Sequence, residues 1–308
     1  VLGSRGLGDV YKRQQWVFNV LYKRGLAYKK AAPANWCPSC KTVLAREQVK
    51  QGKCERCGSE VHIKKMNQWF LKITDYAEEL LTGLDDLDWP EKTKAMQRNW
   101  IGKSEGASVV FTNERVGNLE IFTTRPDTIF GVTYIVMAPE HDLVTRLVTK
   151  EYAEEVDSYV RRTEMLTEIE RQSTTHEKTG VFTGSYAKNP VTGKMVPIWI
   201  SDYVLESYGT GIVMAVPAHD DRDYEFARKY NLEVVPVIDG FNPDGNCAYT
   251  GDGNMINSDF LNGKSVEEAK TLIVRYLTEH NVGGKKVTYR LRDWLISRQR
   301  YWGAPIPI

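Results

Sequence analysis

Hydroxyl, guanidinium and carboxyl groups gather in a short segment, TTRPDT at residues 123–128, between two apolar runs. The hydroxyls of Thr123 and Thr124 both donate and accept hydrogen bonds, so they could hold a water molecule or a carbonyl oxygen. The simpler interpretation is a strand end followed by a turn, because Pro126 fixes φ and the next side chains can bond to nearby backbone. The segment alone leaves both interpretations open.

Carboxylates gather in a second segment, GTGIVMAVPAHDDRDYEF at residues 209–226. Its apolar strand ends at Pro217, and His219, Asp220 and Asp223 open the helix that follows. Asp220 as the N-cap and Asp223 in the first turn would both stabilise the helix N-terminus. Polar groups that a strand delivers to a helix N-terminus also suit an anionic or ammonium-bearing ligand.

Four of the five cysteines form two C-x-x-C pairs, and Cys247 stands alone without a motif. Two such pairs supply the four thiolates of a tetrahedral Zn²⁺ site; a dithiol redox pair and two disulfides are the competing interpretations. Four thiolates leave no position for water, so the zinc would be structural, and its removal would unfold the module at residues 35–65. The expected ligands are Cys37, Cys40, Cys54 and Cys57.

A mixed α/β domain at residues 103–288 must position the two polar segments. Short β-rich runs separated by glycine and proline turns predict strands, and apolar spacing with a capping box at Ser265 and Glu268 predicts helices. The predicted strands are 107–112, 119–124, 132–138, 195–200 and 211–217, and the predicted helices are 141–162, 220–230 and 265–280.

The sequence outside residues 103–288 has different patterns. A helix is predicted from Gln15 to a stop at Gly25, and another places Trp69, Ile73, Tyr76, Ala77, Leu80 and Leu81 on one face before Gly83. Residues 1–14 fit neither pattern, and we interpret them as a non-native leader. Residues 289–308 end just as an apolar strand begins, which predicts a truncated return strand.

The bulk composition excludes some function classes. The net charge is +1 and 42% of the residues are hydrophobic, as in ordinary globular proteins, so any nucleic-acid face must be local. No apolar run reaches the roughly 20 residues that a bilayer requires, so no membrane partner is expected. Without a signal peptide or a disulfide pattern, the expected location is the cytoplasm.

The two polar segments, as TTRPDTIFGVTY and GTGIVMAVPAHDDRDYEF, resemble the signature segments of the editing domain of bacterial-type leucyl-tRNA synthetases. The segments NWCPSCKTVLAREQV, QWFLKITDYAEELL, NWIGKSEG and LRDWLISRQRYWGAPIPI resemble the same family in the same order. The resemblance implies an α/β fold. It consists of a β-rich editing domain at 103–288, of the type that valyl and isoleucyl enzymes share, and the zinc module at 35–65. Remnants of a Rossmann-like catalytic domain are expected at 15–34, 66–102 and 289–308.

The resemblance also implies a role for each polar residue. Thr123 and Thr124 would place the water or the ester carbonyl, and Arg125 would contact the tRNA end or brace the pocket. Asp127 belongs to the same substrate-binding set. Thr128 would fill the space that a leucine side chain needs, so that the cognate ester is rejected.

The second segment would complete the pocket. Met214 and Val216 would form its apolar side, and His219 would contact the terminal adenosine. Asp223 would bind the α-ammonium group of the misattached amino acid, with Asp220 in support.

The expected reaction is post-transfer editing of mischarged tRNA(Leu). Isoleucine, norvaline, valine and methionine differ from leucine by features worth roughly 1–3 kcal/mol in an apolar pocket, so a second, hydrolytic selection is needed. A positioned water would hydrolyse the aminoacyl ester at the tRNA 3′ end, because positioning alone can supply several kcal/mol. The family's ATP-binding signatures are missing here, so ATP would bind only to the full-length enzyme. The expected oligomeric state is a monomer. The alternatives are a zinc-ribbon RNA-binding module and a folded but inactive fragment.

Overall fold

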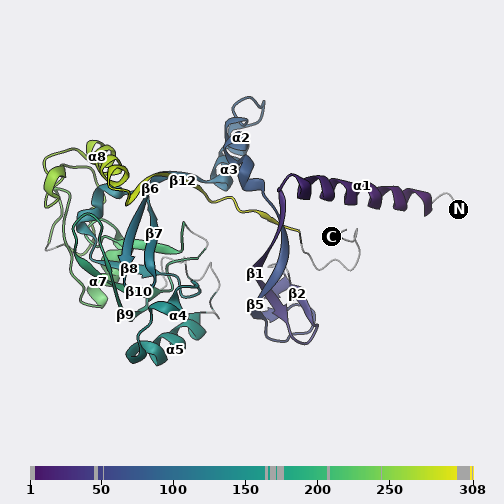
Figure 1. The fold of residues 1–308 in the computed structure, drawn as a ribbon, viewed down its shortest axis with the longest axis horizontal. Coiled ribbons are helices and arrows are strands. Elements are labelled where there is room, and N and C mark those ends of the chain that lie inside the picture. Colours follow the sequence, from purple (N-terminus) through teal and green to yellow (C-terminus); the bar gives the residue numbers. More distant parts are fainter. Residues whose placement is uncertain are drawn as a thin grey trace. The chain divides into compact units, whose positions relative to one another are not determined.

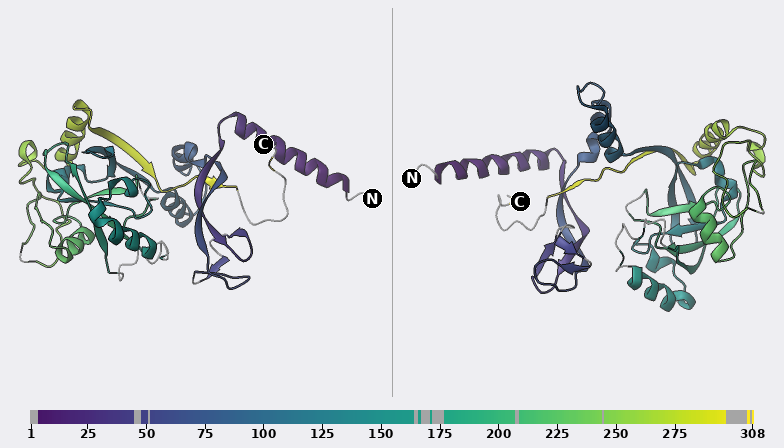
Figure 2. Two further views of the ribbon diagram at one scale, coloured as in Figure 1. Left: turned by 60° about the horizontal axis from the view of Figure 1, so that its bottom comes forward. Right: turned by 180° about the vertical axis from the view of Figure 1, so that it is seen from behind.

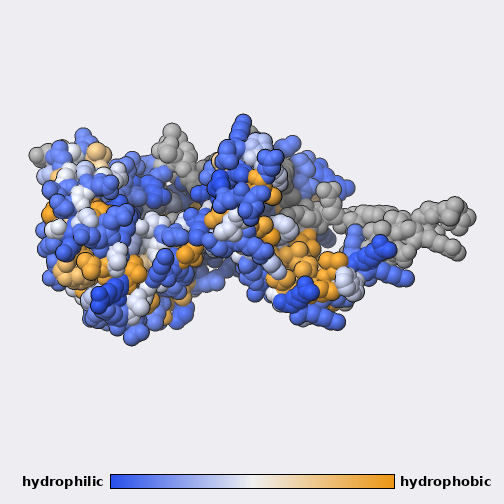
Figure 3. Space-filling view, turned by 90° about the horizontal axis from the view of Figure 1, so that it is seen from above, coloured by the Kyte–Doolittle hydropathy of each residue, from blue (hydrophilic) through white to orange (hydrophobic). Residues whose placement is uncertain are grey.

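The computed structural model describes residues 4–44, 48–50, 52–163, 166, 171, 177–206, 209–243, 245–296, 306 and 308. The chain divides into two compact units. The first comprises Val1–Lys103 and Tyr289–Ile308, and the second comprises Ser104–Thr288. Within the described residues, no helix is both long enough and apolar enough to span a bilayer. On the face drawn in Figure 3, apolar patches are scattered among hydrophilic surface.

The first unit is built on a long antiparallel pair, β1 (Ala27–Cys37) and β5 (His62–Leu71), which lie side by side in both views of Figure 2. Its sheet has the order β13-β5-β1-β2. The first helix of this unit is α1 (Ser4–Lys23), and its shorter strands are β2 (Thr42–Leu44), the pair β3 (Val49–Lys50) and β4 (Lys53–Cys54), and β13 (Trp294–Leu295).

Two elements of this unit begin elsewhere than predicted. The first helix starts at Ser4 rather than Gln15, and it ends before Gly25, whose φ is +72°. The helix predicted to include Trp69 is wrong in its first part, because β5 continues to Leu71, which pairs with Ala27 of β1. Helical structure follows in η2 (Ile73–Tyr76) and α2 (Ala77–Thr82), which Gly83 caps as predicted.

The helix α3 (Glu91–Ile101) follows α2 in the first unit. It ends at Gly102, which has a left-handed conformation with φ +58°. A Cβ atom there would lie 2.6 Å from the Cβ of Arg290, so glycine is required both by the conformation and by the approach of the returning chain. That returning chain is the described part of the segment expected at 289–308; residues 297–305 and 307 lie outside the described residues.

The second unit contains a seven-stranded mixed sheet with the order β11-β8-β10-β9-β6-β12, in which β7 pairs with β6 (Figure 1). Strands β8 and β10 are parallel, whereas the pairs β8–β11, β9–β10 and β6–β7 are antiparallel. The strands are β6 (Lys103–Asn113), β7 (Gly117–Thr123), β8 (Tyr134–Met137), β9 (Gly180–Lys188), β10 (Met195–Ser201), β11 (Ile212–Ala215) and β12 (Gly283–Tyr289).

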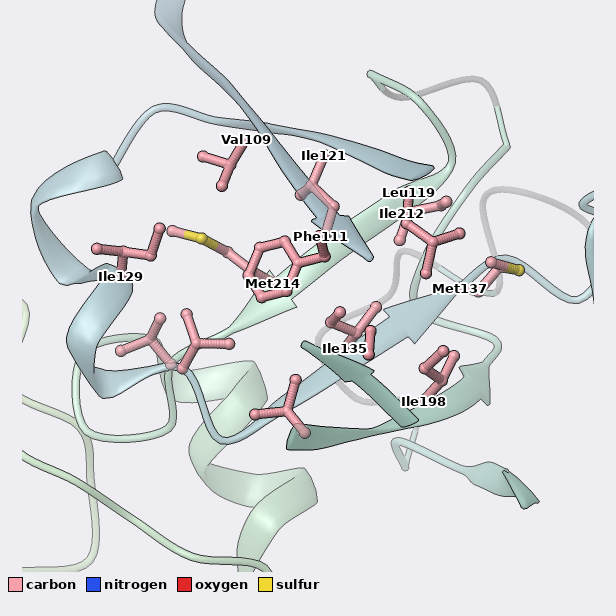
Figure 4. Close-up of a cluster of buried hydrophobic side chains, with 14 of the residues drawn as sticks. Val109, Phe111, Leu119, Ile121, Ile129, Ile135, Met137, Ile198, Ile212 and Met214 are labelled. Carbon is pink, nitrogen blue, oxygen red and sulfur yellow. The ribbon is translucent and has the colours of Figure 1, made fainter. Parts of the chain in front are cut away.

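Alternation along the strands builds the core of this unit. On β6, Val109 and Phe111 are fully buried, and Leu119 and Ile121 of β7 are buried beside them (Figure 4). This period of two places every second side chain on the inner face. The same cluster includes Ile129, which follows the threonine-rich segment, and Ile135, Ile198 and Met214.

Among the described residues, the second unit contains the α-helices α4 (Val144–Leu147), α5 (Ala153–Thr163), α7 (Asp221–Lys229) and α8 (Val266–Glu279). The capping box at Ser265 and Glu268 is confirmed. The single helix predicted at 141–162 is wrong, because Val148 is extended and the N–H of Thr149 bonds to the carbonyl of Thr183. The short η4 (Lys150–Tyr152) then leads into α5.

Candidate functional site

The threonine-rich segment lies where β7 ends and the short helix η3 (Pro126–Gly131) begins. The hydroxyl of Thr123 accepts a hydrogen bond from the N–H of Arg125, and the hydroxyl of Thr128 donates one to the carbonyl of Arg125. Thr124 is exposed, Thr123 is half-buried and Thr128 is 1% exposed. The segment therefore forms the local turn that Pro126 and the neighbouring side chains predict, and it still presents Thr124 to solvent.

Asp127 is fully buried, and its partner is Arg125. Nε of Arg125 lies 3.2 and 3.1 Å from the two carboxylate oxygens, and Nη2 lies 2.8 Å from Oδ2. This forked geometry fixes the plane of the guanidinium group. The carboxylate of Asp127 is thus committed to Arg125, whose side chain stays 32% exposed.

The carboxylate-rich segment opens α7 as predicted. Asp220 is the N-cap, and its side chain accepts hydrogen bonds from the N–H groups of Arg222 and Asp223. The guanidinium of Arg222 also turns back to Asp220, with Nη2 3.1 Å from Oδ2. The N-cap therefore fixes the first turn of the helix that carries Asp223.

Asp223 is the unusual carboxyl of the site. It is 7% exposed, its Oδ1 accepts from the hydroxyl of Tyr203 at 3.1 Å, and its Oδ2 accepts from the N–H of Val216 at 2.9 Å. Among the described residues, no Lys or Arg forms an ion pair with it. Burial, and then the nearby charge of Asp220, raise its pKa from the ordinary 3.8 to about 7. A buried carboxylate without a cation is costly, and a bound cation would relieve that cost.

His219 is held as a neutral imidazole. Its Nδ1 lies 2.8 Å from the carbonyl of Tyr249 and must donate to it, while Nε2 accepts from the N–H groups of Val237 and Ile238. Burial lowers the pKa of this imidazole. Because backbone groups occupy both nitrogens, the contact that we expect with the terminal adenosine stays a prediction and would use the carbon edge or face of the ring.

Packing and charge both connect the two polar segments. Gly131, at the end of η3, lies so close to Val216 that a Cβ atom there would be 3.1 Å from the Cγ1 of valine. Met214 shares the buried cluster with Ile129 (Figure 4). The charges of Arg125 and Asp127 act on the imidazole of His219. Segments that are far apart in the sequence thus converge on one side of the core.

Two tyrosines next to Asp223 were not predicted. Tyr203 follows β10, and Tyr134 begins β8 and donates its hydroxyl to the backbone carbonyl of Asp223. Tyr134 occurs in an apolar run typical of a core strand, and Tyr203 lies in a turn after Ser201 and Asp202, so the sequence offers no signal that either hydroxyl contacts Asp223.

The four clustered cysteines lie together in the first unit. Their sulfur atoms are all within 4.8 Å of one another, with Cys37 and Cys57 3.4 Å apart and Cys40 and Cys54 4.0 Å apart. Tetrahedral Zn²⁺ with bonds of about 2.3 Å needs sulfur atoms about 3.8 Å apart, so the donor set fits the ion. All five cysteines of the chain are unpaired, which argues against the two disulfides.

Comparison with known proteins agrees with this architecture. Residues 8–107 match the profile described as tRNA synthetases class I (I, L, M and V). Residues 98–278 match that of the leucyl-tRNA synthetase editing domain. The fold is thus that of a class I aminoacyl-tRNA synthetase segment that carries an editing domain. Because the second match covers more than half of the chain, the chain belongs to the leucyl-tRNA synthetase editing-domain family.

Individual relatives agree. The leucine–tRNA ligase of Clostridium botulinum is 61% identical over 301 residues, which are 97% of this chain and 37% of that protein. The ligase of Caldanaerobacter subterraneus is 59% identical over 304 residues, 98% of this chain and 37% of that protein. The chain therefore spans a little over a third of the length of these relatives.

A solved structure gives the same result. The Agrobacterium radiobacter K84 agnB2 LeuRS, crystallised as a ternary complex with tRNA and LeuAMS, matches with a TM-score of 0.74 and 38% identity. The match covers 96% of this chain and 34% of that one.

Proposed function

We propose that the second unit hydrolyses the aminoacyl ester of mischarged tRNA(Leu), with isoleucine, norvaline, valine or methionine as the misattached amino acid. Family membership supports the reaction class. The observation that carries the proposal for this chain is Asp223, a buried carboxyl that has two hydrogen-bond donors but forms no ion pair with a Lys or Arg among the described residues. The α-ammonium group of an aminoacyl ester is a cation of suitable size for that carboxyl.

Ammonium binding would also set the charge of the site. With a pKa of about 7, the Asp223 carboxyl is about half protonated at neutral pH. An approaching ammonium favours the ionised form, because opposite charges attract strongly where water is excluded. Binding of the substrate would therefore release the proton and anchor the ester next to the threonine-rich segment.

The ester needs little covalent assistance, because it is already labile. Thr124, whose hydroxyl is exposed, and Thr123 would hold the attacking water or the ester carbonyl. Arg125, which Asp127 fixes in a forked ion pair, would contact the phosphates or ribose of the tRNA end. These hydrogen-bonding groups would act by position, and no covalent enzyme intermediate is required.

We assign the selection between amino-acid side chains to the apolar side of the proposed pocket. Met214 and Val216 would contact the amino-acid side chain, and Thr128, almost fully buried, would occupy the volume that a leucine side chain requires. His219, neutral and fixed by backbone groups, would support the adenosine, while Asp220 would hold the helix turn that carries Asp223.

We assign the four-cysteine cluster to structural Zn²⁺, held by Cys37, Cys40, Cys54 and Cys57. The ion would cross-link the tips of β1 and β4 and take no part in hydrolysis, since four thiolates complete its tetrahedral shell. Leucine activation with ATP belongs to the full-length relatives. The unpaired cysteines are consistent with the cytoplasm as the compartment, and we propose a monomer.

Deacylation of isoleucyl-tRNA(Leu) tests the function. The chain should release isoleucine faster than the spontaneous rate, and Asp223→Asn should lower kcat/KM by about a hundredfold, the effect of losing one charged contact. The asparagine oxygen can still accept from the N–H of Val216 while its amide donates to the oxygen of Tyr203, so folding should be retained. Glu225→Gln, at an exposed carboxylate on the same helix, is the matched control and should leave the rate unchanged.

Two results would contradict the proposal. Hydrolysis that survives Asp223→Asn would show that the ammonium anchor is misassigned. Binding of tRNA that weakens with salt, without any turnover, would instead favour a zinc-ribbon RNA-binding module.

A further inference from the structure

Tyr203 supplies the side-chain hydrogen bond to the Asp223 carboxyl. Its hydroxyl lies 3.1 Å from Oδ1, and the phenol is only 9% exposed. The other donor that reaches this carboxyl among the described residues is the N–H of Val216, on Oδ2. Each oxygen thus accepts one protein hydrogen bond and keeps one lone-pair direction for a ligand.

The turn that carries Tyr203 is itself firmly held. The buried guanidinium of Arg171 donates through Nε to the carbonyl of Asp202 at 2.7 Å and through Nη2 to the carbonyl of Val204 at 2.5 Å. These carbonyls flank Tyr203 on both sides. Arg171 also contacts the carboxylate of Glu140, which neutralises its charge. The phenol is therefore presented to Asp223 from a fixed backbone.

Toward the ionised Asp223 carboxylate, the phenol acts as a hydrogen-bond donor. Burial, reinforced by the neighbouring Asp223, raises the pKa of Tyr203 well above its ordinary value, so the hydroxyl keeps its proton throughout the working range of pH. The hydrogen bond from Tyr203 in turn lowers the pKa of the Asp223 carboxyl and partly offsets the effect of burial.

The other polar groups around Asp223 have different partners. Tyr134, on β8, donates to the backbone carbonyl of Asp223 rather than to its carboxyl. On α7, Arg222 pairs with Asp220, whose negative charge disfavours a second charge on Asp223. Among the side chains, the charge of Arg222 and then the hydrogen bond from Tyr203 lower the pKa of Asp223, and Tyr203 is the one that donates directly to the carboxyl.

We propose that Tyr203 is a positioning residue of this site. Its hydroxyl orients the Asp223 carboxyl and stabilises the ionised form that receives the substrate ammonium. The inference rests on the proposed function, because it assigns Tyr203 to the same ammonium anchor.

The first experiment compares pH profiles of isoleucyl-tRNA(Leu) hydrolysis for the wild type and Tyr203→Phe. Without the hydroxyl, the carboxyl holds its proton to higher pH. The acid limb of kcat/KM should therefore move up by about one pH unit, and activity should recover in alkaline buffer. At pH 7 we expect about a fivefold loss, because the ionised fraction falls from about one half to about one tenth. A purely structural defect would lower the whole profile without moving the limb.

A matched control is available on α7. Tyr224 is 5% exposed, and its hydroxyl donates to the carbonyl of Gly245 instead of to Asp223. Tyr224→Phe should leave the acid limb in place. An unmoved limb in Tyr203→Phe, or an equal shift in both variants, would overturn the inference.

A second experiment separates this inference from the proposed function. Carboxyl-¹³C NMR of aspartate-labelled chain, with Asp223→Asn to identify the resonance, measures the pKa of Asp223 without any substrate. Tyr203→Phe should raise that pKa by about one unit, and an unchanged value would overturn the inference. Absence of deacylation by the wild type would refute the proposed function, whereas the NMR titration would still decide the role of Tyr203.

Discussion

At the scale of single residues, Asp223 combines two roles that the sequence left as alternatives. It lies in the first turn of a helix that Asp220 caps, as local rules predict, and it is also a buried carboxyl that forms no ion pair within the part of the chain that the structure describes. The first role could be derived from spacing. The second could not, because Tyr203 and Val216, which hold the carboxyl, are placed by the sheet.

Burial of Asp223 should appear in the pH dependence of stability. The folded-state pKa, about 7, exceeds the ordinary 3.8, so the folded chain binds more protons in this window. The contribution of Asp223 to the free energy of unfolding is therefore greatest at the acid end of this window. It falls as pH rises from about 4 to about 7, by at most about 1.4 kcal/mol per pH unit. Relative to wild type, Asp223→Asn should remove this slope in urea unfolding at several pH values. Parallel curves for the two proteins would contradict the burial argument.

Thr128 carries the prediction on specificity. If its methyl group fills the volume that leucine requires, Thr128→Ala should allow hydrolysis of leucyl-tRNA(Leu), with a gain of about 10- to 200-fold, the range for one methyl-sized contact. Thr128→Val keeps the volume and loses only the hydrogen bond to the carbonyl of Arg125, so it should still spare the cognate ester. Continued sparing by Thr128→Ala would show that this threonine does not select against leucine.

At the scale of elements, strands that alternate strictly were the easiest to predict. The strands β6 and β7 lie close to their predicted ranges, and so does the helix α8. In each element the apolar residues recur at the spacing that places them on one buried face. The first turns of the helix predicted around Trp69 failed, since pairing with β1 outweighs a helical period. β9 was not predicted, because Gly180 and Gly184 weaken its strand pattern. The first error arises from a partner far along the chain, and the second from glycines within the strand itself.

The cysteine cluster gives a prediction at this same scale. Chelation of zinc should unfold the module at 35–65, because its buried cluster contains little beyond Cys37, Leu44 and Cys54. Proteolysis within the module should accelerate, and one equivalent of zinc per chain should be released. Cys247→Ser, at an exposed and isolated thiol, is the control and should leave the zinc content unchanged. Unchanged proteolysis after complete metal removal would contradict a structural role.

At the scale of the whole molecule, the chain contains two compact units with separate chemistry. The first carries the thiolate cluster, and the second carries the threonine and carboxylate segments together with their core. The sequence could predict this division, because the cysteine spacing and the change to short strands are local signals. It could not predict which buried hydroxyl would face which carboxyl, because that depends on the order of strands in the sheet.

The central claim is that Asp223 recognises the ammonium group of an aminoacyl ester. Its most direct test compares hydrolysis of isoleucyl-tRNA(Leu) with that of a deaminated counterpart, in which a hydroxyl replaces the α-ammonium, for the wild type and Asp223→Asn. Deamination should lower kcat/KM of the wild type by about tenfold to a hundredfold and should have little effect on the variant. An equal loss in both proteins would contradict the claim, because the carboxyl and the ammonium would then act independently.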